Sequence, residues 1–370
     1  MKEINGKRWQ APGNGKGFDS SFENWHGNKM SERSIGALQY IMTHTNVTQL
    51  NFEQNIWEYL HNMYGHEINE SCKSHFFRPI EFFGFIRHYN NLLSVSYNGR
   101  NFIKELELKN YDRVREFFIL QLFNTQYPNT ATKDVKLSLY PFRIIFKLFV
   151  DNMYLLTSDF EYKIPYINDI EDCYEFNNKN SNLYKRGLHF GKYDKLKTWV
   201  INSFVDLNIL VETKGKYELS PYVDSFIMDL VAGIKYEDMF FENEIENNLT
   251  RNKIIVNVKR DTKVINDAIR ENGCKCYFDE THITFETDKM NNFVEGHHII
   301  PMGQQKSFNQ NLDIVDNVIP LCPNCHRLIH LAKNEIKMKY IDKIVNKHNK
   351  LLSFNDITKE DLYELYCTNQ

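Results

Sequence analysis

The sequence predicts an α+β protein with a helix-rich N-terminal region and a smaller C-terminal module of short strands and helices. Two observations predict this organisation. Helical segments alternate with short β-hairpins in the first two thirds of the chain. Cysteines and histidines cluster at metal-ligand spacing in the last third. The expected domains are a polar arm at 1–30, the helix-rich region at 31–245 and the metal-binding module at 246–370.

Composition favours a folded protein without a membrane segment. The 370 residues are long enough for two or three domains, and 42% hydrophobic residues suffice for packed cores. We find no apolar run of membrane length and no signal-peptide pattern, so we expect a cytoplasmic protein that does not contact a membrane. The net charge of −3 argues against nonspecific binding to nucleic acid, because phosphate neutralisation drives such binding. Any nucleic-acid contact should therefore use a local patch.

The N-terminal arm is polar and contains Lys7, Arg8, Trp9 and Lys16, which are candidates for contacts with DNA. A merely solvated arm is the alternative. The segment 30–64 then has the apolar spacing of two helices.

A helix followed by a β-hairpin is expected more than once in the N-terminal region. The segment 82–103 predicts a hairpin with its turn at Asn98-Gly99, and 196–223 predicts a second with its turn at Lys214-Gly215. A looser third copy covers 142–167. A helix packed on a two-stranded wing is the winged-helix plan, and this region resembles the winged-helix recognition regions of some restriction endonucleases.

Cations near these hairpins are candidate DNA contacts. Arg78 and Arg87 flank the first hairpin, and Lys192, Lys195 and Lys197 precede the last. They could contact phosphates or guanine edges. Solvated helix faces or contacts with another protein are the alternatives.

The first metal site is indicated by the CxxC motif at Cys322 and Cys325, which aims two thiolates at one ion. Two more ligands are needed, and Cys276 with His282 is the preferred upstream pair. Cys274 is the alternative ligand. It is less favoured because two cysteines in a CxC spacing bind one tetrahedral ion less readily than two in a CxxC spacing. We therefore expect a structural Zn²⁺, with buried thiols in a reducing compartment as the alternative.

The second cluster begins at His297-His298, between the two halves of the zinc site. Successive strand residues face opposite ways, so one histidine can ligate a metal while the other meets a different partner. His326 and His330 are four residues apart and share one face of a helix. Asn317 lies in a loop, where its amide can hold the backbone.

His298, Asn317 and His326 resemble the H, N and H of the HNH, or ββα-metal, endonuclease family. The stretches EGHHIIPM and LCPNCHRLIH are similar to those of zinc-containing HNH restriction-type nucleases, and CYFDETH resembles a branch with one Cys and one His upstream. The resemblance implies that His298 is the general base, that His297 and His326 bind a divalent ion with His330 as third ligand, and that Asn317 orients His298. The expected catalytic cation is Mg²⁺ or Mn²⁺, although imidazole nitrogens suit Mn²⁺ and later transition metals better than Mg²⁺.

The ends of the module are expected to be helical. The sequence predicts a helix at 261–271, a basic helix near 337–351 and a final helix KEDLYELY capped by Thr358. Lys337, Lys339, Lys343 and Lys347 could line DNA beside the active site, or only solvate a docked helix.

The resemblance therefore implies a site-specific, type II-like restriction endonuclease that hydrolyses double-stranded DNA. Because one small metal site cuts one strand, double-strand cleavage predicts a homodimer or two sequential nicks. The alternatives are an HNH nicking or modification-dependent nuclease, a non-catalytic winged-helix and zinc DNA-binding regulator, and a nuclease that acts on RNA.

Overall fold

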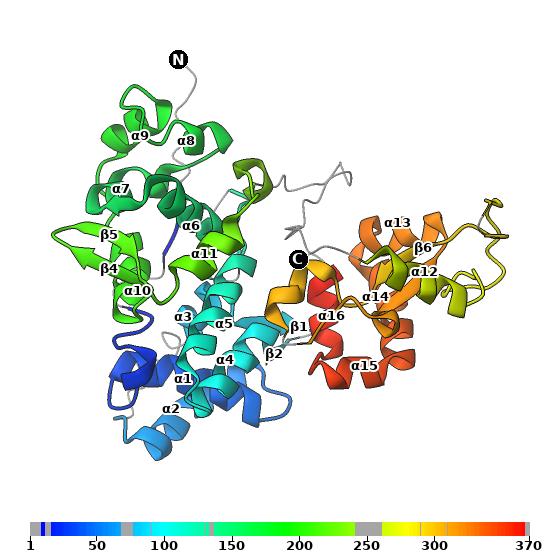
Figure 1. The fold of residues 1–370 in the computed structure, drawn as a ribbon. Coiled ribbons are helices and arrows are strands. Elements are labelled where there is room, and N and C mark those ends of the chain that lie inside the picture. The colour runs from blue at the N-terminus through cyan, green and yellow to red at the C-terminus, as the bar shows by residue number, and fades with distance from the viewer. Residues whose placement is uncertain are drawn as a thin grey trace. The chain divides into compact units, whose positions relative to one another are not determined.

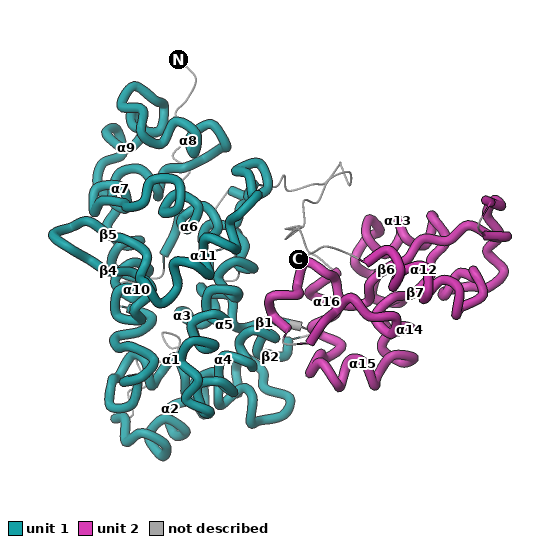
Figure 2. The backbone as a smooth tube through the Cα atoms, viewed as in Figure 1, with its two compact units in different colours: residues 1–243 teal, residues 244–370 magenta. Residues whose placement is uncertain are grey.

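The structure is a computed structural model that describes residues 9–11, 16–67, 77–89, 91–129, 131–132, 137–240, 261–288, 290–308 and 310–366. The chain divides into two compact units, Met1–Asn243 and Glu244–Gln370 (Figure 2). Mixed helix and sheet agree with the expected α+β class (Figure 1). Within the described residues, no helix is both long and apolar enough to cross a membrane.

Unit 1 is mainly helical. Its α-helices are α1 (Lys29–Thr43), α2 (Gln49–Tyr64), α3 (Phe77–Phe82), α4 (Tyr97–Glu107), α5 (Tyr111–Asn124), α6 (Pro141–Asn152), α7 (Thr157–Tyr162), α8 (Ile170–Tyr174), α9 (Asn182–Phe190), α10 (Asn202–Asp206) and α11 (Asp224–Val231). Its shorter helical turns are η1 (Phe22–Asn24), η3 (Ile164–Tyr166), η4 (Lys197–Ile201) and η5 (Tyr236–Met239). Its strands are β1 (Ile86–Tyr89), β2 (Leu92–Val95), β3 (Tyr154–Leu156), β4 (Leu210–Thr213) and β5 (Lys216–Leu219).

The first predicted hairpin exists, but its turn is not at Asn98-Gly99. β1 pairs antiparallel with β2, and Asn91 in the intervening turn has a φ of 64°. The side chain of Ser96 then caps α4 by accepting a hydrogen bond from the Gly99 N–H at 3.0 Å. The predicted turn was wrong because a serine cap places Asn98 and Gly99 in the first turn of a helix.

The second predicted hairpin has its turn where the sequence placed it. Lys214 and Gly215 have φ values of 53° and 77° between the antiparallel strands β4 and β5. β3 pairs with the other side of β5, which gives the order β3-β5-β4. The predicted third copy is therefore not a separate unit, because its single strand completes this sheet.

One aromatic core extends through unit 1. The Phe204 ring on α10 lies within 6.4 Å, between centroids, of the rings of Phe83, Phe118, Phe142 and Phe146. These phenylalanines are almost completely buried. The two hairpin regions consequently share a hydrophobic core.

The described part of the predicted polar arm is packed against the rest of unit 1. Trp9 is fully buried, and its indole N–H donates to the Ile167 carbonyl at 3.0 Å. Lys16 forms an ion pair with Asp206 at 2.5 Å. The expectation that Trp9 is available to DNA was therefore wrong, because a buried indole gains both apolar contacts and a hydrogen bond. Lys7 and Arg8 lie outside the described residues.

The described part of unit 2 contains two strands and several helices. The strands β6 (Glu295–His298) and β7 (Val318–Leu321) pair antiparallel. Its helices are α12 (Thr262–Glu271), η6 (Met302–Ser307), η7 (Val315–Asn317), α13 (Pro323–Leu331), α14 (Asn334–Lys347), α15 (Asn349–Phe354) and α16 (Lys359–Tyr366). The predicted final helix KEDLYELY corresponds to α16. Its expected cap is present, since the Asp361 N–H donates to Thr358 Oγ1 at 3.2 Å and the Thr358 N–H donates to Asp361 Oδ2 at 2.7 Å.

Candidate metal centres and catalytic site

The strand pair β6–β7 and the helix α13 position both clusters of metal-ligating side chains. His297 lies opposite Ile319 in the antiparallel register, and α13 begins at Pro323, directly after β7. Cys322 is the N-cap residue of α13, and its Sγ accepts from the Cys325 N–H at 3.4 Å. This cap fixes the start of the helix that carries Cys325, His326 and His330.

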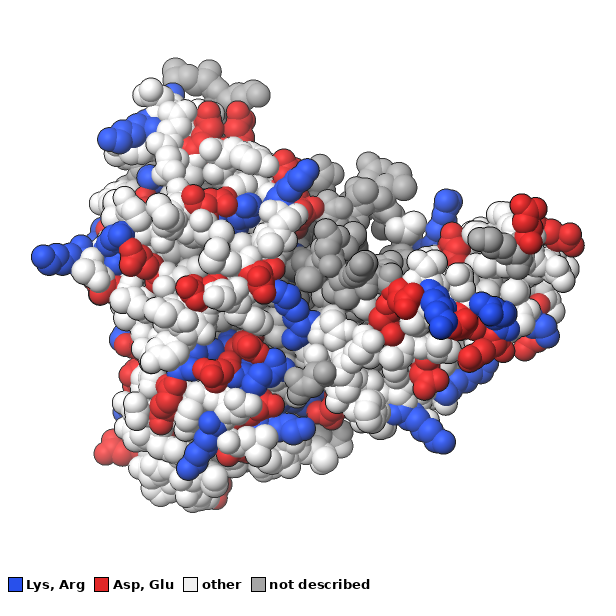
Figure 3. All heavy atoms as spheres, viewed as in Figure 1, with Lys and Arg blue, Asp and Glu red and all other residues white. Residues whose placement is uncertain are grey.

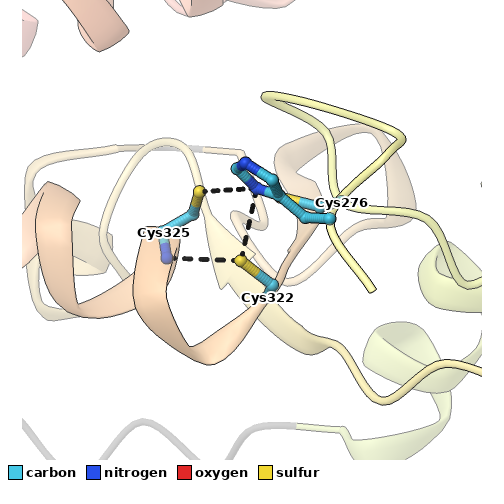
Figure 4. A group of neighbouring side chains, drawn as sticks. Cys276, Cys322 and Cys325 are labelled. Atoms are coloured by element: carbon cyan, nitrogen blue, oxygen red, sulfur yellow. Dashed lines mark hydrogen bonds between the residues drawn. The ribbon is translucent and has the colours of Figure 1, made fainter. Parts of the chain in front are cut away.

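The first cluster contains Cys276, His282, Cys322 and Cys325, whose ligand atoms all lie within 4.8 Å of one another. Nδ1 of His282 is 3.4 Å from Sγ of Cys325 and 3.6 Å from Sγ of Cys322 (Figure 4). Tetrahedral zinc with the usual Zn–S and Zn–N bond lengths requires N···S separations of about 3.5 Å. The donor set and its spacing therefore fit Zn²⁺.

The loop that carries the upstream ligands is tied to β7 and to itself. The Tyr277 N–H donates to the Pro320 carbonyl at 2.8 Å, which brings Cys276 beside Cys322. Nδ2 of Asn292 donates to the carbonyls of Cys274 and His282 at 3.0 and 3.3 Å. Cys274, the alternative ligand, has a φ of 55° and is not one of the four clustered side chains.

The sulfur atoms of this cluster strongly affect one another's ionisation. Burial opposes ionisation of Cys276, but hydrogen bonds from the backbone at Cys322, from the His282 ring and from the backbone nearby outweigh it and lower the thiol pKa to about 7. Burial, together with the neighbouring Cys322 and Cys276 sulfurs, raises the pKa of Cys325. One thiolate thus opposes formation of the next, and a cation would neutralise their charges.

The second cluster contains His297 from β6 and His326 and His330 from α13, with ligand atoms within 4.8 Å of one another. Their ring centroids form a nearly equilateral triangle with sides of 5.1, 4.9 and 5.0 Å. His297 is buried, whereas His326 and His330 are half-buried. Three imidazoles in this arrangement fit one divalent ion, with further ligand positions supplied by water or substrate.

Two residues outside the predicted set contact this triad. Oε2 of Glu295 lies 2.7 Å from Nδ1 of His326, and the Tyr366 hydroxyl lies 2.9 Å from Nε2 of His297. A ligating histidine commonly donates a hydrogen bond from the N–H of its second ring nitrogen to such a partner, and this bond orients the ring. Glu295, two residues before His297, was a visible candidate, but nothing local marked Tyr366.

His298 lies on the other side of β6 and contacts a buried carboxylate that sequence reasoning missed. Its Nε2 is 2.9 Å from Oδ1 of Asp313, and the two side chains are only 6% and 8% exposed. The only local signal was a carboxylate four residues before Asn317. Asp316, directly before Asn317, was an equal candidate as a nearby carboxylate, but it is exposed in the structure.

Asn317 is fully buried and holds the backbone that follows His298. Its Oδ1 accepts from the Ile300 N–H at 2.8 Å, and its Nδ2 donates to the carbonyls of Ile300 and Leu312 at 3.0 and 2.8 Å. Its own carbonyl accepts from the Ile299 N–H at 2.8 Å. Asn317 therefore connects the end of β6 with the loop that carries Asp313.

Lys337 does not line a DNA surface, contrary to the expectation from its sequence. It is 2% exposed, and its Nζ donates to the carbonyls of His330 and Tyr366 at 2.8 and 3.1 Å. The carbonyls at the ends of α13 and α16 compensate for burial of the ammonium group. Lys339, Lys343 and Lys347 are exposed on α14.

The candidate DNA-contacting cations of unit 1 lie on different elements. Arg78 is exposed on α3, Arg87 is half-buried in β1, and Lys195 and Lys197 are half-buried just before or within η4. Lys192 is exposed and pairs with Glu161 at 3.0 Å. On the face drawn in Figure 3, described cations and carboxylates alternate rather than form one basic patch.

A comparison with protein-family models matches part of unit 2. Residues 280–331 match the family model described as HNH endonuclease. A stretch of 55 residues is 40% identical to the type IV methyl-directed restriction enzyme EcoKMcrA of Escherichia coli K12 and covers 14% of this chain. The match spans 18% of that enzyme's length.

Among solved structures, the chain is similar to the BpuJ1 endonuclease binding domain, crystallised with pyrene- and phenanthrene-modified DNA. That likeness has a TM-score of 0.42 and 14% identity, and covers 64% of this chain and 89% of the other. The matched segment 280–331 contains both histidine positions of β6, Asn317 and the histidines of α13. The resemblance drawn from the sequence is thus confirmed for this segment, which matches the HNH endonuclease family model.

Proposed function

We propose that this protein is a site-specific restriction-type DNA endonuclease of type II. Its C-terminal unit would hydrolyse phosphodiester bonds with one divalent ion held by His297, His326 and His330, and with His298 as general base. The observation that carries the proposal is the geometry of β6. This strand directs His297 into the histidine triad and the next residue, His298, to the opposite side against Asp313.

The bound divalent ion would act as a Lewis acid that stabilises charge on the phosphorane-like transition state. His298 accepts the proton of the attacking water. Because its Nε2–H donates to Asp313, the tautomer places the lone pair on Nδ1, the atom that takes the proton. The Asp313 carboxylate then stabilises the imidazolium, and Asn317 holds the backbone beyond His298 in place.

Unit 1 would recognise the DNA site. The elements α6, β3 and α7 precede α10 and the β4–β5 hairpin, and β3, β5 and β4 form one sheet. This order of elements supports a winged-helix interpretation. Arg78, Arg87, Lys195 and Lys197 would contact phosphates or base edges, and Lys192 would exchange its Glu161 partner for a phosphate. A single metal site cuts one strand, so double-strand cleavage requires a homodimer or two successive nicks.

A modification-dependent nuclease is the second candidate. The observation that favours it is the 40% identity, over 55 residues, to an enzyme described as methyl-directed. Both candidates use the same catalytic site and differ in the DNA that unit 1 admits.

Digestion of one plasmid in unmethylated and cytosine-methylated form, with Mg²⁺ or Mn²⁺, tests the proposal. Type II activity predicts discrete fragments from unmethylated DNA, with ends that map to one sequence. Cleavage of the methylated copy alone would support the second candidate. If neither copy is cut but both are retarded in a gel, the protein binds DNA without catalysis and the proposed function is wrong.

A further inference from the structure

The hydroxyl of Tyr366, the last residue of α16, lies at the C-terminal end of β6, the strand that carries both catalytic-site histidines. It is within 2.9 Å of Nε2 of His297, 2.9 Å of the His298 carbonyl and 2.7 Å of the Ile299 carbonyl. Tyr366 is 4% exposed, so water does not replace these partners. Tyr366 also lies 35 residues beyond the end of the matched HNH segment at 331.

Counting donors assigns a tautomer to His297. A phenol has one O–H, and two backbone carbonyls compete to accept it. When the hydroxyl donates to a carbonyl, its oxygen can still accept a hydrogen bond from the Nε2–H of His297. The lone pair of that imidazole then lies on Nδ1. A ring nitrogen without a proton is the one that binds a metal.

Lys337 fixes the helix that delivers Tyr366. Its buried Nζ bonds to the Tyr366 carbonyl at the end of α16 and to the His330 carbonyl near the end of α13. The same ammonium group therefore links the phenol's own residue to a second member of the histidine triad. At its other end, α16 is anchored by the reciprocal hydrogen bonds of Thr358 and Asp361.

We propose that Tyr366 is a positioning residue that holds His297 as its Nε2–H tautomer and thereby prepares Nδ1 to ligate the catalytic ion. The proposal rests on the proposed function, because it takes His297, His326 and His330 as the ion's ligands. It makes α14 and α16 part of the metal centre, although both lie outside the matched segment.

Calorimetric titration of the zinc-loaded full chain with Mn²⁺ tests the proposal without measuring catalysis. The variants are Tyr366→Phe, His326→Ala and Tyr363→Phe. Tyr363 provides a matched control, since its hydroxyl, on the same helix, bonds to Asp342 rather than to the triad. Zinc content and circular dichroism establish that each variant is folded.

We expect Tyr366→Phe to weaken Mn²⁺ binding roughly 10- to 100-fold, the usual effect of losing the partner of a metal-ligating histidine. Tyr363→Phe should bind Mn²⁺ as the native chain does. Native or tighter binding by a folded Tyr366→Phe protein would overturn the inference alone. Equal titrations of the native chain and His326→Ala would instead refute the metal site and, with it, both proposals.

The histidine tautomer provides a second measurement that needs no destabilising tyrosine variant. In ¹⁵N-histidine-labelled, zinc-loaded native protein without Mn²⁺, we expect the His297 signal, assigned by its loss in His297→Gln, to show a protonated Nε2. A protonated Nδ1 and bare Nε2 would contradict the assignment even if Tyr366→Phe failed to fold.

Discussion

Asp313 links His298 to the start of α12. Its Oδ1 lies 2.9 Å from Nε2 of His298, and its Oδ2 accepts from the Asp261 N–H at 2.5 Å. Asp261 is the N-cap of α12, so one buried carboxylate orients the proposed base and holds a helix that packs on β6 and β7. The orientation of His298 therefore depends on a loop residue 15 positions away.

Replacing Asp313 with Asn should lower the cleavage rate. The amide cannot compensate the charge of the imidazolium, and its NH₂ group can reverse the tautomer by donating to Nε2. We expect a loss of about 10- to 100-fold, part of the 10²- to 10⁴-fold contribution usual for a general base. Single-turnover cleavage with Mn²⁺ measures it, and Asp316→Asn is the matched control because Asp316 is exposed. Equal rates for native protein and Asp313→Asn would exclude this role.

Removing the ion from the cysteine–histidine cluster should unfold unit 2 while unit 1 stays folded. Metal binding and folding are coupled in such sites, because the ion joins the loop bearing Cys276 and His282 to Cys322 and Cys325. Hydrogen exchange after chelation should increase in α12–α16 and remain slow in α4–α6. Cys325→Ser should behave similarly, whereas Cys173→Ser, in unit 1, should retain the zinc. Unchanged exchange in unit 2 after complete zinc loss would contradict the structural role.

Substitution of Gly296 should disturb the strand between Glu295 and His297. A Cβ at this position would lie 2.4 Å from Cγ2 of Ile265 on α12, too close for any real contact. We expect Gly296→Ala to destabilise unit 2 by about 1–3 kcal/mol through overpacking. Denaturant unfolding measures the loss, and Ile265→Ala should restore part of it in the double variant. Simple addition of the two losses would refute the proposed clash.

The exposed lysines of α14 should contribute to DNA affinity. Lys339, Lys343 and Lys347 are spaced four residues apart, and the Nζ atoms of the last two lie 5.2 and 4.8 Å from the rings of Tyr340 and Tyr277. If each contacts a phosphate, replacing all three with Gln should reduce the slope of log K against log salt by about 3. Mn²⁺ affinity, measured as a control, should be unchanged. An unaltered salt slope would show that these lysines only face solvent.

The sequence was most informative where ligand chemistry imposes a short spacing. The CxxC motif, the histidine pair and the four-residue spacing of His326 and His330 all belong to local elements. The structure brings the two CxxC cysteines into one cluster and His297, His326 and His330 into another. The roles of Tyr366, Lys337 and Asp313 escaped prediction because their partners are distant in sequence and an ordinary tyrosine, lysine or aspartate carries no local signal for such a contact. The prediction of a turn at Asn98-Gly99 was wrong for the opposite reason. The local signal of a favourable turn dipeptide was present, but the Ser96 helix cap outweighed it.

The most direct test of the account compares single-turnover DNA cleavage by the native chain and His298→Ala, with Mn²⁺ binding measured on the same samples. The account predicts unchanged Mn²⁺ affinity and a cleavage rate at least about 100-fold lower, because the variant keeps the ion's ligands and loses only the base. Cleavage by His298→Ala at the native rate would contradict it.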